Sequence, residues 1–249
     1  MARIRDHVDN APITEALIDL QVSPRDSGDL ELVQKFAGEI DGYEQVGPIM
    51  QLETTWAMSK DDSPQNQSNS IELGVRLQSV DKTYVIQART HGLTVSRLAP
   101  YETWEELLSE TKRHWSQYVS TLQPDTVTRV ATRFINRLKL PMQPGEEFQA
   151  YLSKPPDMPD GLPQAISGFM QRMVVPNPEL GATANLIQLL EEGMVPDDHV
   201  PIILDIDVYK SVSFAPDSDE AWKLLEQLRV YKNAVFFASL TEKTVELFE

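Results

Sequence analysis

Acidic side chains stand at two places where the chain is expected to be extended. In NAPITEALIDLQV (10–22), side-chain alternation puts Glu15 and Asp19 on one face of a strand, about 13 Å apart. In LDIDVY (204–209), Asp205 and Asp207 share a face at about 6–7 Å. Paired carboxylates can bind a divalent cation or act as general acid and base, so a metal-dependent hydrolase is one alternative. Because both separations are long for one ion, no metal ligands are predicted.

Basic side chains gather on one face of another expected strand, residues 127–140. In an extended chain Arg129, Arg133 and Arg137 point to the same side. Guanidinium groups in such a row suit a carboxylate, a phosphate or an acidic partner segment, which they bind in a bidentate manner. Arg97, in an earlier strand, is a further candidate contact. The competing interpretation is a solvated sheet face whose arginines pair with neighbouring carboxylates.

The acidic and basic positions together predict an ion ladder across adjacent strands. Opposite charges that face each other in a sheet are modestly stabilising. The predicted members are Glu15, Asp19, Asp205 and Asp207 on the acidic side and Arg129, Arg133 and Arg137 on the basic side. Since exposed pairs contribute only ~0–1 kcal/mol each, such a ladder would serve recognition or strand register more than stability.

Hydrophobic periodicity predicts the elements that carry these residues. Expected strands cover 10–22, 48–58, 71–80, 83–88, 93–98, 127–140, 165–175, 182–190 and 201–209, and expected helices cover 30–40, 101–123, 146–152 and 221–235. Residues 59–70 contain no apolar side chain and are expected to form a mobile loop.

The order strand, helix, antiparallel meander, long helix occurs twice along the chain. The predicted fold class is therefore α+β, with two pseudo-repeated helix-grip-like units at residues 1–123 and 127–249. No flexible linker separates the units, so one compact body is expected, in which the two sheets can run on as one.

Composition restricts the compartment and the partners. The longest apolar runs, 200–206 and 233–240, are far shorter than the ~20 residues that cross a bilayer, and the N-terminus lacks a signal-peptide core. The chain has no cysteine, which fits a reducing cytoplasm. Its formal charge of −16 disfavours nucleic acid as a partner, because that binding depends on neutralising phosphates. We therefore expect a cytoplasmic protein.

Catalytic and nucleotide-binding motifs are missing from the sequence. It contains no phosphate-binding glycine loop, no G-x-S-x-G and no H-E-x-x-H, and its four histidines stand apart. The sequence therefore favours a protein that is not an enzyme, and it predicts no cofactor.

Four blocks in the same order, NAPITEALID (10–19), SRLAPYETWEEL (96–107), RVATRFINRL (129–138) and LRVYKNAVFFASLT (228–241), resemble a sporadically distributed bacterial family of uncharacterised proteins of similar length. The resemblance covers nearly the whole chain. It supplies no catalytic residues. A scattered distribution implies accessory genes of the sort found with toxin–antitoxin and antiphage loci.

These observations lead to one predicted function and one alternative. The prediction is a cytoplasmic interaction protein, antitoxin-like or defence-associated, that binds a protein partner; a homo-oligomer stays open. The alternative is a helix-grip-type cavity between sheet and helix, where Arg97, Arg129 and Arg133 orient a small anion. The tail, residues 241–249, is expected to dock on the core rather than insert Leu247 and Phe248 into a partner.

Overall fold

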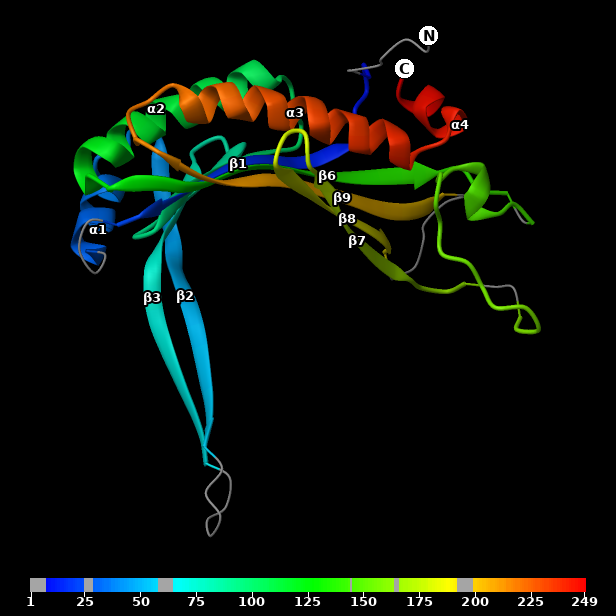
Figure 1. Ribbon diagram of the computed structural model, residues 1–249, viewed down its shortest axis with the longest axis horizontal. Coiled ribbons are helices and arrows are strands. Elements are labelled where there is room, and N and C mark those ends of the chain that lie inside the picture. Colours follow the sequence, from blue (N-terminus) through cyan, green and yellow to red (C-terminus); the bar gives the residue numbers. More distant parts are fainter. Residues whose placement is uncertain (1–7, 25–28, 58–64, 144, 164–165, 192–198) are drawn as a thin grey trace.

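One antiparallel sheet of nine strands organises the protein in the computed structural model, which describes residues 8–24, 29–57, 65–143, 145–163, 166–191 and 199–249 (Figure 1). The described strands lie in the order β2 (Tyr43–Ala57), β3 (Gln65–Ser79), β4 (Tyr84–Arg89), β5 (Gly92–Leu98), β1 (Ile13–Ser23), β6 (Thr126–Leu140), β9 (Val200–Phe214), β8 (Ala182–Leu190) and β7 (Met170–Asn177). The predicted α+β class is confirmed at this level.

The two expected halves meet at the centre of the sheet, where β1 pairs with β6. In this antiparallel ladder Leu17 lies opposite Arg133, Ile18 opposite Thr132, and Asp19 opposite Ala131. The sheet is therefore continuous across the boundary between the halves, and residues that face each other on β1 and β6 share a side of it.

The long helices cover one face of the sheet and leave the other face without a helix (Figure 1). The four α-helices of the described chain are α1 (Leu30–Gly38), α2 (Trp104–Leu122), α3 (Glu220–Ser239) and the short α4 (Glu242–Val245). Helix α2 packs on β1 and β5, and α3 packs on β6, β8 and β9. Both ends of the sheet bend away from the helices, so the helix-free face is concave.

Helix α2 forms where the sequence predicts it. Thr103 caps its first turn by accepting a hydrogen bond from the backbone N–H of Glu106 at 3.2 Å. Its buried side chains recur every three or four residues: Trp104, Leu107, Thr111, His114, Trp115 and Tyr118. This stripe closes the core over the first half of the sheet.

Helix α3 also forms, but its buried stripe differs from the predicted one at its second half. The apolar pattern favours Tyr231 and Val235 as core residues, whereas the structure buries Lys232 and Phe236. From Leu228 the buried positions step by four residues to Lys232 and Phe236 and then by three to Ser239, so the side that faces the sheet passes through Lys232. The core face of α3 therefore contains a lysine.

Three other boundaries differ from the sequence predictions. Strand β3 begins at Gln65, within the expected loop of residues 59–70, because the ladder with β2 is held by backbone hydrogen bonds and needs no apolar side chain. Residues 58–64 lie outside the described residues. The expected helix at 146–152 is only a 3₁₀ turn, Phe148–Ala150. Strand β7 begins at Met170, later than predicted.

The C-terminal tail docks on the core, as predicted. Phe248 is buried, its carbonyl accepts a hydrogen bond from the N–H of Asn10 at 2.8 Å, and Leu247 is exposed. None of the helices in the described residues is long and apolar enough to cross a membrane.

Candidate functional site

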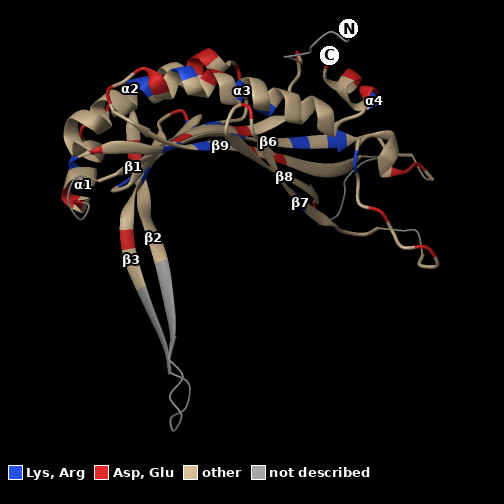
Figure 2. Ribbon diagram, in the orientation of Figure 1, with Lys and Arg blue, Asp and Glu red and all other residues tan. Residues whose placement is uncertain are grey.

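The helix-free face of the sheet brings together most of the charged residues that the sequence singles out. Asp19, only 7% exposed, accepts hydrogen bonds from the guanidinium of Arg129 at 2.8 Å and from that of Arg89 at 2.6 Å. The hydroxyl of Thr94 donates to the same carboxylate at 2.7 Å. Figure 2 shows the basic residues of β6 within this otherwise acidic chain.

The ladder continues onto β9. Arg129 reaches Asp207 at 3.2 Å and stacks 4.5 Å above the ring of Tyr209. The Nε atom of Arg133 donates to Asp205 at 2.8 Å, and a second nitrogen of the same guanidinium binds the other carboxylate oxygen. The cross-strand pairs expected for Asp19, Asp205 and Asp207 are therefore present.

The ends of the predicted ladder are looser. The pKa of Arg133 is raised mainly by its hydrogen bond to Asp205, and the charge of Glu15 adds a smaller effect. Glu15 shares the face with Arg133 but forms no salt bridge within the described part of the chain. Arg137 pairs instead with Glu191 at 2.6 Å, and both side chains are exposed. These outer positions contact solvent more than each other.

Arg97 lies on the opposite face of the sheet, which corrects the expectation that it joins Arg129 and Arg133 around one anion. It faces Ala16 in the β1–β5 ladder and therefore points toward the helices. There it is buried, pairs with Glu102 at 3.1 Å and stacks over Tyr84. The sheet separates Arg97 from the other arginines.

The described residues contain no arrangement of side chains suited to binding a metal ion. No group of three or more His, Asp or Glu side chains among them is placed to hold a metal ion. The carboxylates of β1 and β9 are directed at arginines. Burial raises the pKa of Asp207, although the charge of Arg129 and a hydrogen bond from Asn185 counteract it.

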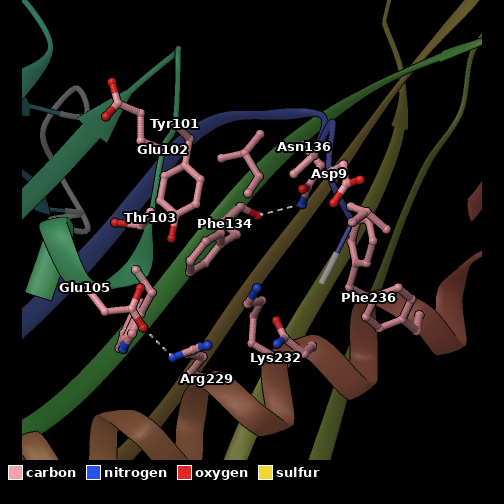
Figure 3. A pocket seen from close by; sticks show the side chains of 16 residues that line it. Asp9, Tyr101, Glu102, Thr103, Glu105, Phe134, Asn136, Arg229, Lys232 and Phe236 are labelled. Carbon is pink, nitrogen blue, oxygen red and sulfur yellow. Dashed lines mark hydrogen bonds and ion pairs between the residues drawn. The ribbon is translucent and has the colours of Figure 1, made fainter. Parts of the chain in front are cut away.

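A pocket of about 180 Å³ lies between the sheet and the helices (Figure 3). Four parts of the chain form it: the segment that leads into β1, the start of α2 with the residues before it, strand β6, and the second half of α3. The residues that line it are Val8, Asp9, Ala11, Ile13, Tyr101, Glu102, Thr103, Trp104, Glu105, Phe134, Asn136, Arg229, Lys232, Asn233, Phe236 and Phe237. It is open to solvent on one side.

Aromatic rings form much of the pocket wall. Phe134 of β6 packs edge-on against Tyr101 at 5.6 Å between ring centroids and stacks against Trp104 at 6.4 Å. The indole N–H of Trp104 is fixed by Glu226 at 2.7 Å, so this ring is held in place. Burial raises the pKa of Tyr101, which keeps its hydroxyl protonated. The wall thus offers flat aromatic surfaces beside polar and charged side chains.

Lys232 is the buried one of the two basic side chains that line this pocket, Arg229 and Lys232. It is only 9% exposed, and its Nζ atom lies 3.8 Å from the centroid of the Phe134 ring. Among the described residues it forms no hydrogen bond and no salt bridge. Burial and, to a smaller extent, the positive charge of Arg229 together lower the pKa of Lys232 to about 7. Within the described part of the chain, this buried amine therefore has no carboxylate that pairs with it.

The remaining charges of the pocket have partners elsewhere. Arg229, one helical turn before Lys232, lies 3.4 Å from Glu105 and 3.4 Å from Glu226. Glu102 is paired with Arg97. Since these carboxylates serve other cations, Lys232 is the cation of the pocket that the described residues leave uncompensated.

Sequence reasoning missed Lys232, although one signal was present. The residue lies four positions after Leu228 and four before Phe236, so it belongs to an apolar stripe at helical spacing. Lysine is almost never fully buried unless it is paired. A lysine in such a stripe therefore marks a position to inspect.

Another cluster of titratable groups joins α2 to β2, but all of its charges are compensated. Burial raises the pKa of Glu110, yet hydrogen bonds outweigh burial and bring the pKa to about 2. The hydroxyl of Tyr43 donates to this carboxylate at 2.7 Å, Arg113 at 3.2 Å, and the buried His114 ring lies 2.9 Å from it. Its geometry is that of a structural contact.

No protein-family model matches this chain, and no curated protein matches it. The geometry of the pocket and of the helix-free face is therefore what indicates function.

Proposed function

We propose that the protein binds a small anion with a flat apolar body in the pocket between sheet and helices. The observation that carries the proposal is Lys232: a buried cation, directed into a pocket, that no carboxylate of the described chain neutralises. This is the cavity alternative raised by the sequence, but with Lys232 and Arg229 in place of the predicted arginines.

The shape of the pocket supports a ligand of this class. A cavity of about 150 Å³ lined by apolar side chains is large enough for benzene. The present pocket, about 180 Å³ and open on one side, leaves room for a ring and a short polar group. Trp104 and Phe134 offer flat surfaces for the ring.

The electrostatics support an anionic group on that ligand. A charge taken out of water is costly unless it is paired, and Lys232 meets this cost with only the face of one aromatic ring. A bound carboxylate or phosphate would supply the missing negative charge. Such binding would also raise the pKa of Lys232, because an opposite charge nearby favours the protonated amine.

Calorimetric titration tests the proposal with benzoate, phenylacetate, 3-phenyllactate and inorganic phosphate. We expect at least one carboxylate to bind and Lys232→Met to weaken its binding by about tenfold, as loss of a charge-assisted hydrogen bond predicts. Lys223→Met is the matched control, since Lys223 lies on the same helix but is exposed. It should bind as the wild type does.

Two results would contradict this function. One is that none of the four anions binds the wild-type protein at millimolar concentration. The other is equal weakening in Lys232→Met and Lys223→Met, which would mean that general surface charge, and not the pocket, attracts the anion.

A second proposal, protein interaction through the helix-free face, is favoured by exposed apolar side chains at both ends of the sheet. Val46 and Ile71 are exposed on β2 and β3, and Met170 and Val174 are exposed on β7. Apolar side chains at the rim of a concave face suit a protein partner. The antitoxin-like or defence-associated role that the family resemblance implies belongs to this second proposal.

Purification of the tagged protein from its host, followed by native mass spectrometry, tests the second proposal. A stoichiometric protein partner that Val174→Glu releases and Val230→Glu retains would support it. Val230 is also exposed but lies on α3, on the other side of the molecule. A single chain in all three preparations would refute it.

We also propose that the two halves are copies of one helix-grip unit, a meander packed on a long helix. The order of strands supports this. In one half β1 is followed by a meander that returns to lie beside β1, and then by α2; in the other, β6 is followed by a meander that returns beside β6, and then by α3. The central antiparallel pair of β1 and β6 is what a twofold relation between the halves requires.

A further inference from the structure

The amine of Lys232 differs from the amines of surface lysines in its protonation and in its position inside the pocket. Lys232 lies one turn after Arg229 on α3, and both side chains extend into the space beneath Tyr101 and Phe134 (Figure 3). No described carboxylate binds the Nζ atom of Lys232, which lies 3.8 Å from the centroid of the Phe134 ring in the pocket wall.

The surroundings of Lys232 favour the neutral amine. Burial and the neighbouring Arg229 bring its pKa to about 7, so near neutral pH a large share of the amine carries a lone pair. The acidic groups that line the pocket are Asp9 on the segment before β1 and Glu102 and Glu105 at the start of α2. Glu102 and Glu105 are paired with arginines, so they do little to retain the proton on Lys232.

An amine that is desolvated and lies next to a second cation is the arrangement that activates lysine as a nucleophile toward carbonyl groups. In this pocket the second cation has a further use. Arg229 can bind a carboxylate attached to the carbonyl carbon, because it lies one helical turn from Lys232 on the same face of α3. An apolar side chain on the carbonyl compound would then lie against Trp104 and Phe134.

We propose that the ligand is a small 2-oxo acid with a flat apolar side chain, and that Lys232 holds it covalently and reversibly as an imine. This inference rests on the proposed function, because it assigns the ligand class of the same pocket. Lys232 is the nucleophile, Arg229 orients the carboxylate, and the aromatic wall receives the side chain.

The bond changes balance without an oxidant or a reductant. The lone pair of Nζ attacks the carbonyl carbon, a C–N bond forms, and the carbonyl π electrons move to oxygen, which takes a proton from solvent through the open side of the pocket. Nitrogen releases a proton, and the hydroxyl group then takes up a proton and leaves as water while the C=N bond forms. The nitrogen finally releases its second proton to solvent, which gives the neutral imine. The net reaction converts one amine and one oxo acid into one imine and one water.

Reductive trapping tests the inference. The full chain is incubated with phenylpyruvate and sodium cyanoborohydride, which adds hydride to the C=N bond and makes the link permanent. We expect intact-protein mass spectrometry to show one adduct, equal in mass to the acid less one oxygen atom, and peptide mapping to find it on Lys232. Lys232→Met should lose this adduct and Lys223→Met should retain it.

The role of Arg229 has its own control. Phenylacetaldehyde offers the same ring and a carbonyl group but no carboxylate. Arg229→Gln should lower the rate of trapping of phenylpyruvate relative to that of phenylacetaldehyde by about tenfold, since only the oxo acid loses a charge-assisted contact. An unchanged ratio would overturn the assignment of Arg229.

A non-reacting analogue separates this inference from the function on which it rests. 3-Phenyllactate carries a hydroxyl group where phenylpyruvate carries the carbonyl. If 3-phenyllactate binds in a manner that depends on Lys232 but phenylpyruvate is not trapped there, the imine is overturned and anion binding stands. If phenylpyruvate is trapped on Lys232 while 3-phenyllactate neither binds nor competes, the imine stands and anion binding falls. Adducts spread evenly over surface lysines would overturn the imine.

Discussion

On the helix-free face of the sheet, Arg129 lies between Asp19 and Asp207, whereas on the helix face Lys232 lies in a pocket with no carboxylate partner among the described residues. Both cations lie against the same sheet. Its two faces can be followed on β6, where Arg133 points to the helix-free face and its neighbour Phe134 points to the helix face. The first cation is compensated by the fold itself. The second is not.

This difference indicates where to look for function. Charges that already have partners at 2.6–3.2 Å are explained by the stability and register of the sheet. A buried charge without a partner lowers the stability of the folded state, so its presence calls for another reason. In the sequence the mixed row of arginines and aspartates is the more conspicuous pattern, yet Lys232 of α3 is the stronger indication of a binding site.

The largest effect is expected where the paired network is broken at its centre. Asp19→Ala leaves the partly buried Arg89 and Arg129 without their shared carboxylate, so we expect the free energy of unfolding to fall by about 3 kcal/mol. Urea denaturation measures the change. Glu15→Ala, on the same strand face and without a salt bridge to a described residue, should change it by less than about 0.5 kcal/mol. Equal effects would mean that the network is not stabilising.

On the helix face we expect the free energy of unfolding to change in the opposite direction, because a substitution at Lys232 removes an unpaired buried charge. Lys232→Met should raise the free energy of unfolding at pH 7 by about 2 kcal/mol. The unfolded chain keeps this proton up to the ordinary lysine pKa of 10.5, whereas the folded chain releases it near 7. The stability of the wild type should therefore rise with pH between these values, and the advantage of the variant should shrink over the same range.

Thermal unfolding of both proteins from pH 6 to pH 10 measures this difference. The comparison of variant with wild type cancels the titration of all other groups. A variant that is less stable than the wild type at pH 7 would show that Lys232 has a stabilising partner and would remove the contrast between the faces.

Glu110 is a paired charge on the helix side and can be compared directly with the unpaired Lys232. The folded pKa of Glu110, about 2, is below its ordinary value of 4.5, so the carboxylate stabilises the fold above pH 4.5 and loses this effect as the pH falls through 2. Glu110→Gln should cost about 1 kcal/mol at pH 7, with the difference from wild type vanishing between these pH values. Acid denaturation followed by circular dichroism tests this. A difference that is constant down to pH 2 would contradict it.

The smallest effect is expected at the rim of the helix-free face. Arg137 and Glu191 are both exposed, so Arg137→Ala should change the free energy of unfolding by only ~0–1 kcal/mol and less at high salt. Urea denaturation at two salt concentrations checks the value. A loss as large as that of Asp19→Ala would mean that the whole ladder acts as one unit.

Much of the sheet and the ion network was predictable from sequence because both follow local rules. Side-chain alternation predicted that Arg129 and Arg133 share one face of β6 and that Asp19 points to one face of β1. Because the two strands are adjacent and antiparallel, only the register between them was needed to bring these side chains together. The positions of α2 and α3 followed from helical periodicity in the same way.

The same rules could not predict on which face of the sheet Arg97 lies or that Lys232 is buried. Alternation gives the relation between residues of one strand, but not which side of a distant strand faces the helices. Helical spacing allowed two stripes on α3, one through Tyr231 and one through Lys232, and the more apolar stripe was not the buried one. The extension of β3 into a polar segment was missed because its ladder depends on backbone groups, which no side-chain pattern reports.

By itself the amino-acid sequence determined most of the residues that become strands and helices, because alternation and helical spacing act over a few residues, and it determined which charges share a strand face. Only the tertiary structure decided which face the helices cover and how α3 turns against β6. These decisions depend on contacts between parts of the chain more than 90 residues apart, as between Phe134 and Lys232. That packing makes one lysine the unpaired charge of a pocket and makes the arginines parts of a paired network.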